Sequence, residues 1–312
     1  MNVRWRGVFP AVTTQMKRDQ SLDLEATARH LDVLIDSGVA GLVMLGSLGE
    51  NQQLLPEEKR RVMSMAIDTA RGRVPVLSGV IENSTAAAIE YARDMERLRA
   101  DGLMLLPGMI YRADARETVA HYRVVAAATA LPIICYNNPL AYQIDITPEM
   151  FAELADVKNF VAIKESSGDV RRITDLRNAT GDRYVLFCGV DDLVLESVVL
   201  GATGWIAGMG LAFPRENQFF WDRAIAGDYE TARRLYAWYT PLLHLDTPVK
   251  FVQYIKLAIQ EAGLGSEWVR APRLPLVGEE RERILAIIQR GLETRPTIPG
   301  QTRVKWRLNA FV

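Results

Sequence analysis

Short apolar segments rich in β-forming residues alternate with longer helical patterns along the whole of this 312-residue chain. We count eight such segments, each followed by a candidate helix. They end near Phe9 and at Gly46, Val80, Pro107, Asn137, Glu165, Gly189 and Gly208. Strands that are covered by helices on both faces are expected to be continuously apolar, and these segments are. The alternation therefore predicts a parallel sheet surrounded by helices.

The number of strands favours an α/β fold of one kind, the (β/α)8 TIM barrel, in which eight parallel strands close into a ring. An open, doubly wound sheet is the weaker alternative. The helices have recognisable ends: the segment "PEEKRRVMSMAIDTARG" starts with Pro56 in a first-turn position and stops near Gly72.

The residues that follow the eighth strand form more helical patterns than a barrel requires. We therefore predict a barrel over residues 1–225, which carries the active site, and a C-terminal helical domain over residues 226–295. The tail, residues 296–312, has little periodicity and is a candidate for disorder.

Composition narrows the class of partner. The 37 Lys and Arg residues are balanced by 38 Asp and Glu residues, which does not favour a nucleic acid. The chain has neither a signal peptide pattern nor an apolar stretch long enough to span a membrane. We expect a cytoplasmic protein that binds a small neutral or anionic molecule.

Cysteine and histidine are too few and too scattered for a disulfide framework or a metal site. Cys135 and Cys188 lie in apolar segments, as small core residues do. His30, His121 and His244 lie in separate segments without ligand-like spacing. No metal is expected.

The segment "FVAIKESSGD" places Lys164 at the end of a buried strand. In a barrel, side chains at the C-terminal ends of the strands face the active site. Loss of water contact lowers the pKa of a lysine and leaves more free amine to attack a carbonyl. The alternative is that Lys164 only pairs with Glu165 or Asp169, and for a single lysine that alternative is favoured.

Two further strand ends favour the catalytic interpretation. The "GSLGE" turn presents backbone N–H groups and the Ser47 hydroxyl, which suit a carboxylate, although a glycine-rich turn is common. The "YNNP" motif places Tyr136 beside the strand of Lys164, where a phenol can relay protons. A buried tyrosine followed by a turn explains the same motif equally well.

The last two strand ends provide candidates for contact with the distal part of a substrate. These are Gly189 and Asp191 in "CGVDD" and Ile206 in "GATGWIAG". Asp191 is also a good helix N-cap, which is the commoner use of aspartate at such a position.

Taken in order, "GSLGE", "YNNP" and "VAIKES" resemble the dihydrodipicolinate synthase and N-acetylneuraminate lyase family of class I aldolases. The likeness runs from about residue 7 to about residue 290. It implies a barrel with a C-terminal helical domain, usually a homotetramer, that needs no cofactor. It also implies that Lys164 forms a Schiff base, that Tyr136 relays protons and that Ser47 binds the carboxylate of a 2-oxo acid.

Three positions depart from the pattern of the lysine-biosynthetic synthases. "YNNPLAY" has Leu140, Ala141 and Tyr142 where those enzymes have an arginine for a second carboxylate, and Leu48 replaces a second hydroxyl. Of their tyrosine pair after the fourth strand, only Tyr111 is nearby. We therefore expect the usual hydroxyl relay to a neighbouring subunit to be absent. The departures argue against dihydrodipicolinate synthesis, and the apolar Leu48 argues against sialic acid cleavage.

The overall pattern looks most like the family branch that deaminates 1-pyrroline-4-hydroxy-2-carboxylate to 2-oxoglutarate semialdehyde and ammonia in hydroxyproline catabolism. The alternative within the family is an aldolase or dehydratase of 2-keto-3-deoxy sugar acids, or another related aldolase. A non-catalytic sensor of 2-oxo acids is the alternative from a different class.

Overall fold

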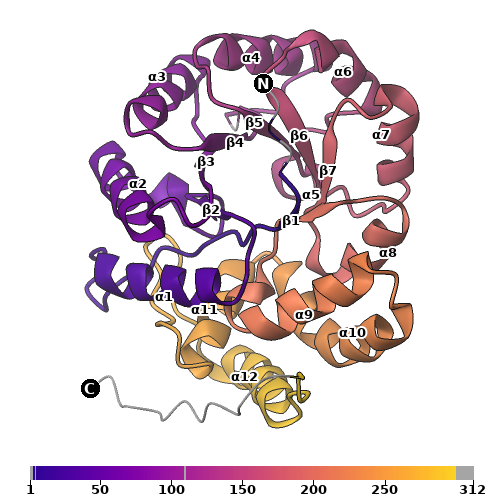
Figure 1. Ribbon diagram of the computed structural model, residues 1–312. Coiled ribbons are helices and arrows are strands. Elements are labelled where there is room, and N and C mark those ends of the chain that lie inside the picture. The colour runs from indigo at the N-terminus through magenta and orange to yellow at the C-terminus, as the bar shows by residue number, and fades with distance from the viewer. Residues whose placement is uncertain (1–2, 4, 109, 300–312) are drawn as a thin grey trace.

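The fold is an eight-stranded parallel sheet that curls into a barrel with helices on its outer face (Figure 1). A computed structural model describes residues 3, 5–108 and 110–299 of the chain. In these residues the sheet order is β1-β8-β7-β6-β5-β4-β3-β2, and every ladder is parallel. The strands are β1 (Gly7–Val8), β2 (Leu42–Met44), β3 (Val76–Val80), β4 (Gly102–Leu105), β5 (Ile133–Asn137), β6 (Phe160–Glu165), β7 (Val185–Cys188) and β8 (Gly204–Trp205).

Backbone hydrogen bonds between the first and second strand segments close the ring. Ala40 donates to Val8 at 2.8 Å, and Val12 donates to Val43 at 2.8 Å. Val43 in turn donates to Pro10 at 3.0 Å. Because the first and last strands of the sheet order are joined in this way, the predicted (β/α)8 barrel is confirmed over the weaker alternative of an open sheet.

Helices follow the strands in the order that the sequence predicts. They are α1 (Leu24–Asp36), α2 (Pro56–Ala70), α3 (Thr85–Arg97), α4 (Ala115–Ala127), α5 (Pro139–Tyr142), α6 (Pro148–Glu153), α7 (Arg172–Thr180), α8 (Val194–Val199) and α9 (Pro214–Ile225). Side-chain caps define several of the helix starts: the Asp23 carboxylate accepts from the backbone N–H of Ala26 at 2.8 Å, and Asp114 does the same for Glu117.

Three further helices pack beside the barrel, α10 (Tyr229–Leu243), α11 (Phe251–Glu261) and α12 (Gly278–Glu293), drawn in orange and yellow in Figure 1. The indole N–H of Trp238 in α10 donates to the carbonyl of Gly291 in α12 at 3.2 Å. These helices are the predicted C-terminal extension. The domain boundary at residue 225 stays a prediction, because α9 and α10 pack closely together.

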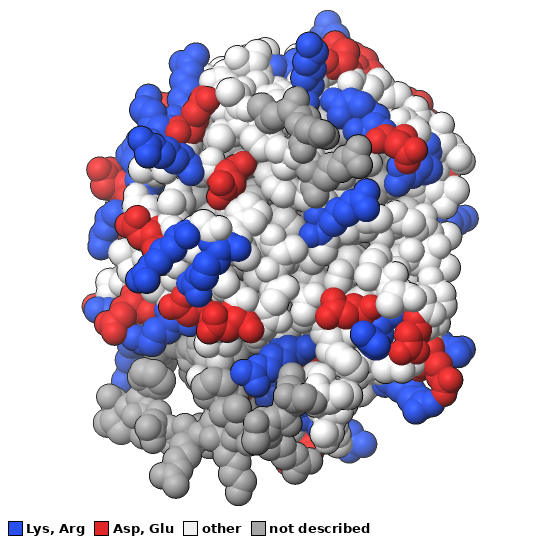
Figure 2. All heavy atoms as spheres, viewed as in Figure 1, with Lys and Arg blue, Asp and Glu red and all other residues white. Residues whose placement is uncertain are grey.

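The predicted disordered tail, residues 296–312, lies mostly outside the described residues. Within the described part of the tail, Ile298 is buried. Among the described residues, no helix is both long and apolar enough to cross a bilayer. On the face shown in Figure 2, basic and acidic side chains lie side by side and do not separate into patches of one sign.

Candidate active site

Lys164 lies near the C-terminal end of β6, between Tyr136 of β5 and Phe187 of β7 in the strand register. Its side chain is only 6% exposed. The Nζ atom is 3.8 Å from the centre of the Tyr136 ring. Burial lowers the pKa of Lys164, and the nearby Tyr142 and Asp246 oppose that shift. The result is an amine with a larger neutral fraction than an exposed lysine has.

Glu165 and Asp169, the two acids expected as alternative partners of Lys164, interact with other groups. The Glu165 carboxylate accepts from the Asn137 side chain at 3.1 Å and from the backbone N–H of Ser167. Asp169 pairs with Arg171 at 2.7 Å. Neither acid therefore forms an ion pair with Lys164, and the chemical role of this lysine stays a prediction.

Tyr136 is buried at the end of β5, and burial raises the pKa of its phenol. Its hydroxyl accepts a hydrogen bond from Asn138 Nδ2 at 3.0 Å. The Oδ1 atom of Asn138 also accepts from the backbone N–H of Ala141 at 3.0 Å and so caps the short helix α5. The "NP" part of the motif thus fixes both the phenol and the turn that follows it.

Tyr142 lies at the candidate site, and sequence reasoning missed it. From the sequence, it is only one of the residues found where the synthases have an arginine. Helix α5 carries it back to the barrel mouth, where its ring meets Tyr136 edge-on, with centroids 5.7 Å apart. Its hydroxyl is hydrogen-bonded to Ser47 Oγ. Tyr142 is 95 residues from Ser47 along the chain, so no local pattern announces the contact. One signal was available in the sequence: Asn138 and Pro139 are a typical helix start, and an aromatic residue one turn later faces back toward that start.

The "GSLGE" turn follows β2 and holds Ser47 half-buried and Leu48 fully buried. Among the described residues, the backbone N–H groups of Ser47 and Leu48 donate to no backbone carbonyl. These N–H groups and the Ser47 hydroxyl form a set of donors that suits a carboxylate.

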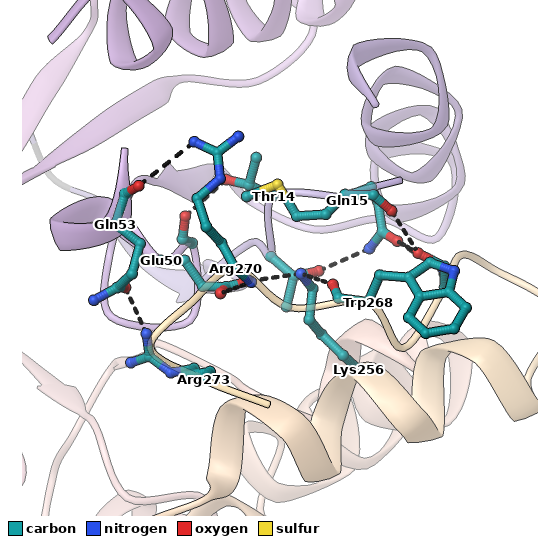
Figure 3. Close-up of polar contacts among 12 residues, drawn as sticks. Thr14, Gln15, Glu50, Gln53, Lys256, Trp268, Arg270 and Arg273 are labelled. Carbon is teal, nitrogen blue, oxygen red and sulfur yellow. Dashed lines mark hydrogen bonds and ion pairs between the residues drawn. The ribbon is translucent and has the colours of Figure 1, made fainter. Parts of the chain in front are cut away.

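An ion pair fixes the far end of this turn to the C-terminal helices (Figure 3). Glu50 is fully buried and adopts a positive φ of 55°. Its carboxylate accepts from Lys256 Nζ of α11 at 2.6 Å and from the backbone N–H of Arg270 at 2.9 Å. Lys256 also donates to the carbonyl of Trp268 at 2.6 Å. The "GSLGE" turn is therefore supported from outside the barrel.

Gly189, just after the end of β7, makes room for the side chain of Lys164. A Cβ atom at this position would lie 2.7 Å from Cε and Cγ of Lys164 and would also collide with Ser166 Oγ. The buried Ser166 hydroxyl has no hydrogen-bond partner among the described residues. The structure thus places Gly189 beside Lys164, and the predicted contact of Gly189 with the distal part of a substrate stays a prediction.

Asp191 and Ile206 are both buried near this end of the barrel. The Asp191 carboxylate accepts from Trp205 Nε1 at 2.9 Å and from the backbone N–H groups of Gly208 and Met209. It therefore holds the loop after β8 and does not cap its own helix. Burial raises the pKa of Asp191 to about 6. Substrate contact by Asp191 and by Ile206 stays a prediction.

Comparisons with known proteins agree with this geometry. The model of the dihydrodipicolinate synthetase family matches residues 4–291. A 4-hydroxy-tetrahydrodipicolinate synthase of Archaeoglobus fulgidus is 34% identical over 295 residues, which are 93% of this chain and 99% of the relative. One from Phenylobacterium zucineum is 33% identical and covers 91% of this chain and 97% of its own.

Solved structures show the same likeness. A putative dihydrodipicolinate synthetase from Pseudomonas aeruginosa superposes with a TM-score of 0.87 at 31% identity, covering 92% of this chain and 99% of its own. The dihydrodipicolinate synthase of Acinetobacter baumannii, complexed with pyruvate, has the same TM-score and coverage at 28% identity. These names support the family but not the deaminase branch that the motifs favour.

The matches extend over nearly the whole chain and include the strand ends that carry Ser47, Tyr136 and Lys164. Fold, sequence and the arrangement of these three side chains therefore agree, and the chain belongs to the dihydrodipicolinate synthetase family.

Proposed function

We propose that this protein is a Schiff-base-forming lyase that acts on a small 2-oxo or cyclic 2-imino acid. The observation that carries the proposal is Lys164, a buried amine against the ring of Tyr136 whose neighbouring acids are paired elsewhere. A strand-end lysine with a lowered pKa is suited to nucleophilic attack on a carbonyl carbon.

The surrounding groups have distinct parts in the first step. The carboxylate of the substrate binds to Ser47 and the free N–H groups of its turn, which orients the carbon at position 2 toward Lys164. The amine attacks that carbon, and the oxygen leaves as water, or the ring nitrogen of a cyclic imine is released. Tyr136 transfers the protons that these steps require. The protonated imine then attracts electrons and acidifies the adjacent carbon.

The relatives favour aldol chemistry as the next step. Loss of a proton from carbon 3 gives an enamine that adds to an aldehyde, or the reverse reaction cleaves the bond between carbons 3 and 4. The named relatives are synthases, and the solved relative complexed with pyruvate supports a 2-oxo acid as the ligand. A 2-oxo acid aldolase of this family is thus the function that we propose first.

Deamination of 1-pyrroline-4-hydroxy-2-carboxylate is the second candidate, and a specific observation favours it. The segment Leu140, Ala141 and Tyr142 has no arginine where the synthases typically have one, and Leu48 replaces a second hydroxyl, so this segment offers no cationic partner to a second carboxylate. In this reaction, the carbon 3 proton and the 4-hydroxyl leave together as water. Isomerisation and hydrolysis then release ammonia and 2-oxoglutarate semialdehyde.

Borohydride trapping with pyruvate tests the shared part of both candidates. We expect a covalent adduct on Lys164 in the wild-type protein and none in Lys164→Ala. Failure of the wild-type protein to form the adduct would sink the Schiff-base assignment.

Product analysis then separates the reactions. The protein is incubated with 1-pyrroline-4-hydroxy-2-carboxylate and, separately, with 2-keto-3-deoxygluconate. Stoichiometric ammonia identifies the deaminase, and pyruvate identifies the aldolase. Adduct formation without turnover of either compound would favour the sensor.

The two tyrosines give a matched pair of variants. Tyr136→Phe is expected to lower kcat about 100-fold to 10,000-fold, because it removes the proton relay, and to change KM little. Tyr142→Phe is expected to raise KM more than it lowers kcat, because it removes the hydroxyl that positions Ser47. An effect of Tyr136→Phe on KM alone would contradict the relay.

We also propose a homotetramer, as the family resemblance implies. Three exposed apolar side chains are suited to contact with a second copy: Ile110 and Tyr111 in the loop after β4, and Leu140 in the short helix α5 after β5. Light scattering on the purified protein measures the mass directly, and a monomer would contradict this proposal.

A further inference from the structure

The segment that connects the C-terminal helices α10 and α11 places the carboxylate of Asp246 at the barrel mouth. Asp246 ends the short 3-10 turn η5 (His244–Asp246), which follows α10. Its partly buried side chain lies directly against Gly208, in the loop after β8. Any Cβ atom at position 208 would collide with the Asp246 carboxylate. The absence of a side chain at Gly208 is therefore what admits Asp246.

A second contact holds η5 in place. His244 Nδ1 is 2.7 Å from the Asp192 carboxylate, in the 3-10 turn η3 (Asp191–Leu193) after β7. Leu245, between His244 and Asp246, is buried. With its first residue bound to η3 and its second residue buried, η5 keeps Asp246 at the ends of β7 and β8.

Asp246 differs from its neighbour Asp191 in how its charge is satisfied. Asp191 accepts hydrogen bonds from an indole and two backbone N–H groups. Asp246 accepts none from the part of the chain that the structure describes. Burial and the negative charge of Asp191 raise the pKa of Asp246, while Lys164 opposes that shift. A carboxylate kept here without a donor weakens the fold, which is typical of a group reserved for a ligand.

The order of the strands shows which part of a substrate would meet Asp246. The carboxylate-binding group, Ser47 with Tyr142, lies beside Tyr136 of β5, and Lys164 is on β6. The neighbouring strands on the other side are β7 and β8. A 2-oxo acid with its carboxylate at Ser47 and carbon 2 at Lys164 thus extends its remaining carbons toward β7 and β8. At the ends of these strands, Gly189 lies against Lys164 and Gly208 lies against the Asp246 carboxylate, so Asp246 borders this side of the barrel mouth.

We propose that Asp246 accepts a hydrogen bond from the 4-hydroxyl group of a bound 4-hydroxy-2-oxo or 2-imino acid, and that, when ionised, it repels substrates with a second carboxylate at that end. The inference rests on the proposed Schiff-base function and narrows its substrate class. Carbon 4 carries the reacting oxygen in both candidate reactions, because aldol addition creates this hydroxyl and dehydration removes it.

Three 2-oxo acids that differ only at the distal end test the proposal. They are 2-oxopentanoate, 4-hydroxy-2-oxopentanoate and 2-oxoglutarate. Each is trapped on Lys164 with borohydride over a range of concentrations, and mass spectrometry separates the adducts. For the wild-type protein, we expect the 4-hydroxyl to improve half-saturation roughly tenfold to hundredfold, as a hydrogen bond to a charged group does. We expect 2-oxoglutarate to bind more weakly than 2-oxopentanoate.

Two variants separate the hydrogen bond from the charge. Asp246→Ala should lose the preference for the 4-hydroxyl and bind 2-oxoglutarate better than the wild-type protein does. Asp246→Asn keeps an acceptor oxygen, so it should lose the exclusion of 2-oxoglutarate and retain part of the hydroxyl preference. Asp182→Asn, which removes an exposed carboxylate on the outer surface, is the control and should match the wild-type protein.

Pyruvate trapping distinguishes the ways in which the proposal can fail. If the wild-type protein does not trap pyruvate, the Schiff-base function fails and this inference fails with it. If all variants trap pyruvate but Asp246→Ala keeps the hydroxyl preference, only the role of Asp246 is overturned. If Asp246→Ala does not fold, the isosteric Asp246→Asn decides, and undiminished exclusion of 2-oxoglutarate in that variant contradicts the proposal.

Discussion

Lys164 and Lys256 are two of the three lysines, with Lys59, that are almost completely buried among the described residues, and the surroundings of these two are opposite. Lys256 in α11 is 0% exposed and binds the Glu50 carboxylate and a backbone carbonyl. Lys164 in β6 is 6% exposed and contacts an aromatic ring, with no carboxylate within ion-pair distance among the described residues. Burial lowers the pKa of both, but only Lys256 has a directly bonded anion to oppose the shift.

The comparison of Lys164 with Lys256 shows that burial alone does not identify a reactive amine. A buried amine that is fully hydrogen-bonded serves the fold, because removing its partner leaves an uncompensated charge. A buried amine without such a partner destabilises the fold and remains available to an electrophile. The partners of the ammonium group, and not its exposed fraction, therefore separate the two roles.

Replacement of Lys164, the proposed nucleophile, should have the largest effect on activity. Lys164→Met is expected to lower turnover on the order of 10⁴-fold or more, because no other group supplies the covalent step. The same change should leave the free energy of unfolding unchanged or raise it by about 1 kcal/mol, since it removes a buried amine without a counter-charge. Steady-state kinetics and urea unfolding measure the two effects. If Lys164→Met loses as much stability as Lys256→Met does, Lys164 also serves the fold and the two lysines do not differ in role.

Replacement of the structural lysine should do the reverse. Lys256→Met leaves the Glu50 carboxylate buried without its cation, so we expect a loss of about 3–5 kcal/mol in the free energy of unfolding. Adding Glu50→Gln to the same chain should restore part of that loss, because it removes the uncompensated charge. Thermal unfolding of the single and double variants checks this. If the double variant is less stable than the single variant, the ion pair is not the cause.

His30 is a second buried basic group without an anionic partner among the described residues, so its titration provides another test of the same rule. His30 donates from Nε2 to the carbonyl of Leu211 at 2.8 Å, and burial lowers its pKa to about 4. The folded chain therefore keeps His30 neutral between pH 4 and 6.5, while the unfolded chain takes up a proton below 6.5. Stability should fall by about 3 kcal/mol as the pH drops through this window. Urea unfolding at several pH values measures the slope, and His30→Gln should flatten it.

The eight strand segments were predictable because continuous apolar runs reflect burial on both faces of a sheet. The bounds of β1 and β8 were not, since regular pairing there covers only two residues of each strand. Beyond these, single hydrogen bonds such as Phe9 to Trp205 continue the contact. Irregular pairing of this kind depends on how the ring closes, which no local pattern records.

The candidate site was predictable to a similar degree. Lys164, Tyr136 and Ser47 could be proposed as candidates because each stands at or just after the end of a strand, which in a barrel faces the same mouth. Tyr142 and Asp246 could not, because helix α5 and the turn η5 carry them back to the mouth from segments that are not strands. Their positions follow from tertiary packing and not from spacing in the sequence.

The bond between Glu50 and Lys256 has a consequence for protein engineering. The turn that is expected to hold the substrate is braced by α11 and by the segment around Arg270 (Figure 3). A chimera that exchanges the C-terminal helices with those of a relative must therefore carry over a lysine that meets this glutamate. Without that lysine, the exchanged protein would bury the Glu50 carboxylate without a counter-charge at the end of the turn that carries Ser47 and Leu48.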